Sequence, residues 1–238
     1  MTDIQTRTLG DIVAGNPATA RALDRLGLDY CCHGQRSLES ACVEAGLDPR
    51  AVLAELDAIE STGDAGWAGL EPPALADHIV ESHHRYLKEE LPLLDGLAEK
   101  VLAVHGERHP ELAEVRELVH EIRADLEPHL MKEERILFPA IRDLCQGRRD
   151  FPFGSIGNPI RMMLLEHDRA GELLAAVRTA TGGYAIPAHA CASYRSLYER
   201  LEALEADTHL HVHKENHTLF PATLELEAES HHGENTGR

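Results

Sequence analysis

Two stretches of the sequence carry the same set of residues that could bind a metal. Residues 129–139 and 211–221 share the pattern H-x-x-K-E-x-x-x-L-F-P with identical spacing. On an α-helix, a step of four residues turns about 400° and rises about 6 Å, so the histidine and the glutamate of each copy point the same way. His129 with Glu133, and His211 with Glu215, are therefore predicted to form two metal-binding arms.

A single histidine precedes each arm by nearly the same distance. His84 lies 45 residues before His129, and His167 lies 44 residues before His211. This repetition indicates a duplicated pair of helices, and each pair contributes two histidines and one glutamate. Imidazole and carboxylate donors without a thiolate suit iron, manganese, zinc or copper. Two ions bridged by the two glutamates would leave room for small outside ligands, which favours iron.

The second half of the chain is predicted to form the helices that position these residues. Helical periodicity covers residues 74–104, 110–146, 157–181 and 188–226, and short loops separate these segments. Loops this short favour antiparallel neighbours, so we predict an all-α protein with an up-down four-helix bundle. Six candidate ligands fall on apolar stripes that would face the bundle centre. They are His84, His129, Glu133, His167, His211 and Glu215.

Six polar groups inside a bundle need a physical reason. Burying an ionised carboxylate or imidazole without a partner costs several kcal/mol, and one or two metal cations would offset this cost. The alternative is that each histidine is an ordinary core or rim residue, which suits one position better than six matched ones. Four further histidines lie off the stripes and are expected to be solvated or to make outer contacts. They are His83, His209, His213 and His217.

The first 60 residues are predicted to form a small helical unit. Capping residues, proline and glycine indicate helices over residues 17–26, 37–46 and 49–59. The loop at residues 29–34, Asp-Tyr-Cys-Cys-His-Gly, is expected to be exposed. Adjacent cysteines can close only a strained disulfide ring, which suits thiol exchange, nitrosyl transfer or transient iron binding. Cys31 and Cys32 are therefore the candidate reactive residues, unless one is simply a small buried side chain.

Length and charge set further limits on the protein. We predict an N-terminal domain over residues 1–62, a linker rich in glycine and proline over 61–73, a bundle over 74–226 and a disordered tail over 227–238. The net charge of −18 argues against nucleic acid or an anionic membrane as a partner. Because the sequence has neither a run of 18 apolar residues nor a signal peptide, a cytoplasmic location is expected.

With this ligand set, residues 74–224 resemble the hemerythrin-like family of di-iron four-helix bundles, which use H-x-x-x-E arms. The sequence departs from the oxygen-carrying members at one place. Those members have a second histidine four residues before the third-helix ligand, where this chain has Met163. The resemblance, with one histidine fewer, implies a more open and more labile iron pair.

A closer resemblance, to the repair-of-iron-centres family, covers nearly the whole chain. That family joins an ScdA-type N-terminal domain, marked by adjacent cysteines as in residues 29–34, to a bundle with segments like Glu166-His167-Asp168 and residues 131–139. Both motifs occur here in the same order. Pro128, directly before His129, departs from this pattern and can kink the second helix and shift that ligand.

This resemblance implies a di-iron protein that helps to restore iron-sulfur clusters damaged by oxidative or nitrosative stress, through iron donation, nitric oxide handling or both. The implied cofactor is a pair of non-haem iron ions with an oxo or hydroxo bridge. The implied partners are damaged iron-sulfur cluster proteins and small ligands such as nitric oxide or oxygen, and a homodimer is compatible with the resemblance. Cys31 and Cys32 would deliver or receive the cargo.

Two other functions stay open for the same centre. Two adjacent ferrous ions could reduce nitric oxide or peroxide, because each can bind one small molecule and supply one electron. Alternatively, the centre could be a sensor or carrier of oxygen or nitric oxide, with the N-terminal unit passing the signal on.

Overall fold

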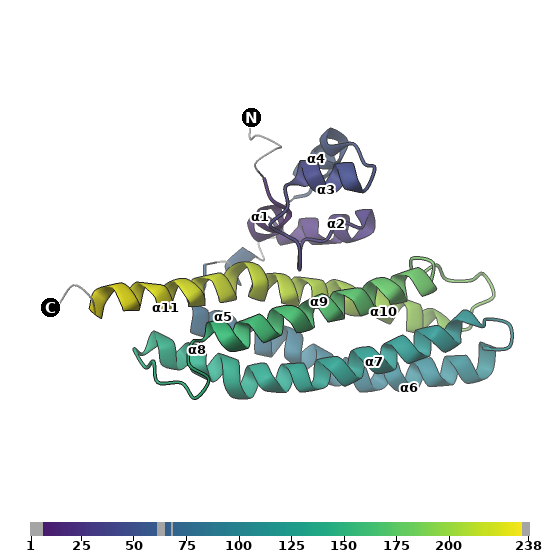
Figure 1. Ribbon diagram of the computed structural model, residues 1–238. Helices are drawn as coiled ribbons and strands as arrows, with labels where there is room; N and C mark the ends of the chain where they lie inside the picture. The colour runs from purple at the N-terminus through teal and green to yellow at the C-terminus, as the bar shows by residue number, and fades with distance from the viewer. Residues whose placement is uncertain (1–6, 61–64, 68, 235–238) are drawn as a thin grey trace. The chain divides into compact units, whose positions relative to one another are not determined.

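The computed structural model describes residues 7–60, 65–67 and 69–234 of the chain. This described part contains helices and turns but no strand, and Thr8 and Ser37 form an isolated antiparallel bridge. Figure 1 shows the individual helices and their labels. The predicted all-α fold is confirmed. Within these ranges, no helix combines the length and the apolar character that a membrane span requires.

Two compact units make up the chain, and neither is one continuous stretch of sequence. The first contains the residues up to His78, residues 141–149 and the residues from His209 onward, and the second contains residues 79–140 and 150–208. Three of the four breaks between the units, after residues 78, 140 and 208, fall within helices, and the break after residue 149 falls in a loop. The domain limits suggested by the sequence therefore stay a prediction.

The four long helical segments occur close to where the sequence places them. Each consists of one or more helices, and three of them include a π-helical turn, labelled η. In chain order the elements are α5 (Pro72–Ile79), η3 (Val80–His84), α6 (Arg85–His105), α7 (Glu111–Lys132), η4 (Glu133–Leu137), α8 (Phe138–Cys145), α9 (Gly157–Ala180), α10 (Ala192–Lys214), η5 (Glu215–Leu219) and α11 (Phe220–Glu234).

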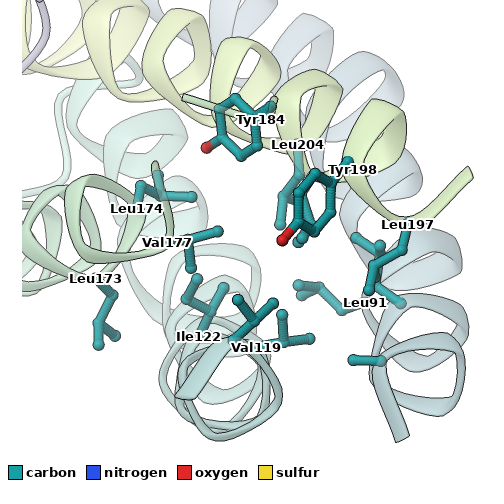
Figure 2. Packing of buried hydrophobic residues seen from close by; sticks show 14 of the residues in the cluster. Leu91, Val119, Ile122, Leu173, Leu174, Val177, Tyr184, Leu197, Tyr198 and Leu204 are labelled. Atoms are coloured by element: carbon teal, nitrogen blue, oxygen red, sulfur yellow. The ribbon is translucent and has the colours of Figure 1, made fainter. Parts of the chain in front are cut away.

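Apolar side chains from four helices form the core of the second unit. Leu91 of α6, Val119 and Ile122 of α7, Leu174 of α9 and Leu204 of α10 are buried members of this one cluster (Figure 2). Burying a side chain of this size contributes roughly 1.5–3 kcal/mol. The apolar stripes of these helices therefore hold the bundle together, and they fix which face of each helix points inward.

The π turns coincide with three of the candidate ligands. His84 is the last residue of η3, while Glu133 and Glu215 are the first residues of η4 and η5. The backbone N–H groups of Phe138 and Phe220 donate to the carbonyls of the glutamates five residues earlier. Wide turns of this kind are rare in proteins as a whole, but many of those that occur lie at functional sites. The sequence analysis, which assumed regular helices, missed all three.

A proline directly after the wide turn gives a physical reason for η4 and η5. Pro139 and Pro221 follow the last bonded phenylalanine of each turn. A proline ring clashes with the carbonyl four residues earlier in a regular α-helix and has no N–H to donate. A turn with one extra residue relieves that clash. The same reason does not apply to η3, which no proline follows directly.

Four short helices form the N-terminal part of the first unit. They are α1 (Leu9–Gly15), α2 (Ala20–Leu26), α3 (Leu38–Glu44) and α4 (Pro49–Asp57), and a 3-10 turn, η1 (Pro17–Thr19), precedes α2. Ser37 and Asp48 cap α3 and α4 through their side-chain oxygens, and Gly27 ends α2 with a φ of 67°. The sequence analysis predicted the last three helices but missed α1.

The sequence analysis also made local predictions for the tail, the linker and Pro128. Residues 227–234 are helical rather than disordered, since α11 continues to Glu234; the stretch LELEAE at 224–229 is rich in strong helix formers. The last four residues lie outside the described ranges, as do residues 61–64 and 68 of the predicted linker. Pro128 lies inside α7 without ending it, and His129 stays buried.

Candidate metal centre

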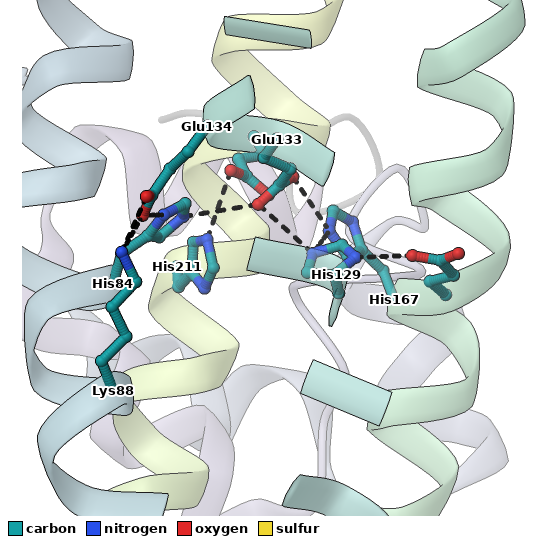
Figure 3. Close-up of polar contacts among 9 residues, drawn as sticks. His84, Lys88, His129, Glu133, Glu134, His167 and His211 are labelled. Atoms are coloured by element: carbon teal, nitrogen blue, oxygen red, sulfur yellow. Dashed lines mark hydrogen bonds and ion pairs between the residues drawn. The ribbon is translucent and has the colours of Figure 1, made fainter. Parts of the chain in front are cut away.

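Glu133 lies among three buried histidines of the second unit (Figure 3). Its Oε2 is 3.4 Å from Nε2 of His84 and 3.4 Å from Nε2 of His129, and its Oε1 is 4.0 Å from Nε2 of His167. The Nε2 atoms of His129 and His167 are 3.2 Å apart. These four side chains are at most 3% exposed. The fold thus gathers one carboxylate and three imidazole nitrogens in a site closed to solvent.

An outer carboxylate orients the ring of His84. Its Nδ1 lies 2.9 Å from Oε1 of Glu134, and Nζ of Lys88 donates to both oxygens of that carboxylate, at 2.6 and 2.7 Å. Burial alone would raise the pKa of Glu134, but the hydrogen bonds from Lys88 and His84 outweigh it and the pKa is lowered. Because an ionised carboxylate only accepts hydrogen bonds, Nδ1 carries the proton of His84.

The ring of His129 is oriented in the same way. Its Nδ1 lies 2.9 Å from Oε2 of Glu166, and Lys132 pairs with the other oxygen of that carboxylate. The hydrogen bond from His129, together with Lys132, lowers the pKa of Glu166 to about 2. The sequence analysis did not assign this orienting role to Glu166 or to Glu134, although each directly neighbours a candidate ligand in the sequence.

These outer contacts decide what the inner nitrogens present to Glu133. With the proton on Nδ1, a neutral imidazole directs the Nε2 lone pair at the carboxylate. Both oxygens of Glu133 are buried and accept no hydrogen bond within the described part of the chain. Lone pairs and a negative carboxylate repel one another, and an unpaired buried charge is costly. A cation between them removes both penalties, so the donors fit a metal ion.

The second arm, on α10 and η5, shows the predicted pairing. Nε2 of His211 is 3.2 Å from Oε1 of Glu215, and both side chains are buried. His211 and Glu215 belong to the first unit, and the other four candidate ligands belong to the second. A single centre formed by all six residues therefore stays a prediction.

A pocket of about 250 Å³ reaches the outer side of this cluster between α7 and α9. His129 lines it together with the charged residues Asp125, Lys132, Glu166 and Arg169. Water and small ions can therefore approach the Nδ1 side of His129.

Asp29 organises the turn that carries the two candidate cysteines. Its Oδ1 accepts the backbone N–H groups of Cys31 and Cys32, at 3.0 and 2.9 Å, and its Oδ2 is 2.6 Å from Nδ1 of His33. The two Sγ atoms are 3.7 Å apart, and neither cysteine forms a disulfide. Cys31 is buried and Cys32 is half-buried, so the prediction of an exposed loop is wrong for Cys31.

The chemistry of this turn follows from its crowding. The neighbouring thiol of Cys32, burial and the charge of Asp29 raise the pKa of the Cys31 thiol well above its ordinary value. Burial alone would raise the pKa of Asp29, but hydrogen bonds, chiefly from His33 and the backbone of Cys32, lower it. At neutral pH the turn therefore combines a charged carboxylate with a protonated Cys31 thiol.

Hydrogen bonds hold the cysteine turn on the helical segment that carries the second His/Glu pair. Nδ2 of Asn216 and Nε2 of His217 donate to the carbonyl of Cys31, at 3.1 and 2.9 Å. Nδ1 of His213 lies 3.2 Å from the carbonyl of Tyr30. The N-terminal cysteines are thus fixed by residues about 185 positions later in the chain.

Two of the off-stripe histidines are buried, which excludes solvation for them and leaves the other expectation, that they make outer contacts, as a prediction. His83 is 4% exposed and its Nδ1 lies 2.8 Å from Asp207. His213 is fully buried, and burial lowers its pKa to about 4, so it stays neutral near pH 7. His209 is half-buried and lies 2.8 Å from Asp24.

Comparison with known protein families agrees with this geometry. Residues 75–223 match the family described as the hemerythrin HHE cation binding domain, and residues 5–60 match the ScdA_N domain of unknown function (DUF542). The first match alone covers more than half of the chain. The chain belongs to the hemerythrin HHE family. Cation binding by the buried His/Glu cluster therefore agrees with both the family and the structure.

Curated relatives match this HHE domain protein over nearly their full length. The iron-sulfur cluster repair protein ScdA of Staphylococcus haemolyticus is 31% identical over 89% of this chain and 95% of its own length. The iron-sulfur cluster repair protein YtfE of Enterobacter sp. (strain 638) is 36% identical over 91% and 96%, and that of Escherichia coli O8 is 32% identical over 91% and 96%. The resemblance to the repair-of-iron-centres family is confirmed. The names of these relatives give no support to the reductase or sensor alternatives.

Proposed function

We propose that the protein binds two iron ions and takes part in the repair of iron-sulfur clusters damaged by oxidative or nitrosative stress. The observation that carries the metal assignment is the buried carboxylate of Glu133, which faces three imidazole nitrogens and accepts no hydrogen bond from the described residues. The repair function is supported by the names of the relatives, which this chain matches over nearly their whole length. The proposed ligands are His84, His129, Glu133, His167, His211 and Glu215.

The number and type of the donors support two metal positions. Four histidines allow two for each ion, and Glu133 and Glu215 would bridge the ions. Nitrogen and carboxylate donors without thiolate suit iron. When bound, an iron pair supplies one-electron redox chemistry and a store of exchangeable metal.

The protein's own residues would keep this store exchangeable. Glu134 and Glu166 hold two histidine rings with Nε2 toward the centre, so the donors are ready before the metal arrives. Met163, buried at the place where a further histidine would add a donor, supplies no nitrogen. A centre with fewer protein ligands leaves positions for outside ligands and releases its metal more easily.

Iron donation is the activity that we propose, with ferrous ion as the cargo and proteins with damaged iron-sulfur clusters as the recipients. Cys31 and Cys32 would deliver or receive the cargo, because the helical segment that carries His211 and Glu215 is hydrogen-bonded to the carbonyl of Cys31. The direct test is transfer. Protein loaded anaerobically with Fe²⁺ should hold about two irons per chain and should rebuild the cluster of an apo iron-sulfur protein when sulfide is supplied.

A matched pair of variants makes this test specific. Glu133→Gln should lose most of the iron and the transfer, because it removes the negative charge at the centre. Glu127→Gln should keep both, since this carboxylate lies on the same helix but pairs with Arg123, 2.7 Å away. Iron that stays bound in the presence of the apo protein would refute donation. Consumption of nitric oxide without iron transfer would assign the centre to nitric oxide handling instead.

A further inference from the structure

Asp29, Cys31 and Cys32 bring three potential metal ligands together outside the His/Glu centre. One donor atom from each residue lies within 4.8 Å of the other two. The Sγ atoms of the cysteines are 3.7 Å apart, and Oδ1 of Asp29 is 3.3 Å from Sγ of Cys31. In a tetrahedral site with metal–sulfur bonds of about 2.3 Å, two thiolates are about 3.8 Å apart. The sulfur spacing therefore already suits a single ion.

The spacing is built into the turn. The backbone N–H groups of Cys31 and Cys32 donate to Oδ1 of Asp29, which holds the carboxylate beside the sulfurs. From the other side, Asn216 and His217 hold the carbonyl of Cys31. Little rearrangement is needed before a cation can bind, and a preorganised site binds more tightly than a flexible one.

An outer contact completes the arrangement. Oδ2 of Asp29 lies 2.6 Å from Nδ1 of His33, whose side chain is 58% exposed. In metal sites, a ligating carboxylate is itself hydrogen-bonded, and this fixes its orientation. His33 occupies that position relative to Asp29.

We propose that Asp29, Cys31 and Cys32 form a second metal site that takes a thiophilic divalent cation, such as Zn²⁺ or Fe²⁺. Binding exchanges the two thiol protons for the ion and changes no oxidation state. The sulfur donors distinguish this site from the nitrogen and carboxylate donors of the His/Glu centre. Three protein ligands leave a fourth position open for a ligand from outside. The site requires neither iron donation nor an occupied His/Glu centre.

Co²⁺ is a suitable probe, because thiolate ligands give it a charge-transfer absorption in the near ultraviolet that nitrogen and carboxylate ligands do not. Titration of the reduced, full-length protein with Co²⁺ should produce this absorption, with a final intensity that corresponds to one thiolate-bound ion per chain. Cys31→Ser and Cys32→Ser should each abolish it, and Asp29→Asn should weaken binding at this site by about tenfold or more. Cys145→Ser removes an exposed free thiol elsewhere and should change nothing.

Glu133→Gln separates this proposal from the proposed function. It should lower binding at the His/Glu centre and leave the thiolate absorption intact. An absorption missing from the wild-type protein, kept by Cys31→Ser and Cys32→Ser, or lost in Cys145→Ser would overturn the second site.

A measurement on the wild-type protein guards against variants that fold poorly. Zn²⁺ should slow the alkylation of Cys32 by iodoacetamide, read by mass spectrometry, at least tenfold relative to that of Cys145, because a metal-bound thiolate is a poor nucleophile. Equal rates with and without Zn²⁺ would also overturn the proposal.

Discussion

At the scale of single residues, the centre depends on side chains that do not face it. Glu134 and Glu166 accept hydrogen bonds from the Nδ1 atoms of His84 and His129 and so direct the opposite nitrogens inward. An outer carboxylate fixes the tautomer and raises the basicity of the ring, and both effects strengthen metal binding. The affinity of the site is therefore set partly by residues that never touch the ion.

Glu166→Gln tests this role. The substitution keeps the size of the side chain but removes its charge, so metal binding should weaken by about 10- to 100-fold. Competition against a chelator of known affinity measures the change. Glu121→Gln is the matched control, since Glu121 is exposed and pairs with Arg169. Equal affinity of wild type and Glu166→Gln would mean that packing alone fixes the ring.

Gly34→Ala tests how tightly the cysteine turn packs against His217. A Cβ at this position would lie 2.3 Å from the carbonyl oxygen of Tyr30 and 2.5 Å from Nε2 of His217. Since the first of these atoms belongs to the backbone, the overlap should destabilise the protein by about 1–3 kcal/mol in chemical unfolding. Gly15→Ala is the control, because nothing lies within 4 Å of that Cβ. A stable Gly34→Ala protein would show that the turn can leave His217 at little cost.

At the scale of elements, the π turns adjust the register of the ligands along the bundle helices. Glu133 and Glu215 each begin a wide turn that ends just before the Phe-Pro pair of the repeated motif. The L-F-P part of the motif thus belongs to the metal arm, because it sets the backbone geometry at the glutamate.

Pro139→Ala should allow η4 to return to regular α-helical geometry. Glu133 would then rotate away from its present direction, and metal binding should weaken by about tenfold, as for a lost orienting contact. Chelator competition measures the affinity, with circular dichroism as a check on helicity. Pro92→Ala is the control, because Pro92 is exposed inside α6, where no π turn precedes it directly. If the affinity does not change, the ligands rather than the proline impose the wide turn.

At the scale of the whole molecule, metal binding and folding are linked. The bundle buries Glu133 without a hydrogen-bond donor among the described residues. This burial destabilises the fold, and a bound metal ion would offset the unfavourable free energy. A ligand present at 100 to 1,000 times its dissociation constant stabilises the folded state by about 2.7–4.1 kcal/mol. The apo protein should therefore be less stable than the loaded one by a similar amount.

Chelation and Glu133→Gln together test this linkage. Removing the metal should lower the free energy of unfolding of the wild type by about 3–4 kcal/mol. The apo form of Glu133→Gln should be more stable than the apo wild type by about 1–3 kcal/mol, since its amide can donate to the Nε2 lone pairs. Urea unfolding of the four samples measures both effects. If apo Glu133→Gln is less stable than the apo wild type, the buried carboxylate does not destabilise the apo protein.

The sequence by itself determined the features that depend on local periodicity. Helix length, the apolar stripes and the repeated His/Glu spacing follow from 3.6 residues per turn, and each can be read without knowing which helices meet. For that reason the all-α fold and the family resemblance were correctly predicted. The ligand roles of the six residues and the chemistry of Cys31 and Cys32 stay predictions.

Only the tertiary structure decided the contacts between distant parts of the chain. The roles of Glu134 and Glu166 depend on which helix faces pack together, and the hydrogen bond from Asn216 to Cys31 joins residues 185 positions apart. Nothing in the sequence pattern specifies such a pair, because either residue could face solvent equally well on its own element. Burial of the apolar stripes selects the facing surfaces, and the polar contacts follow from that choice.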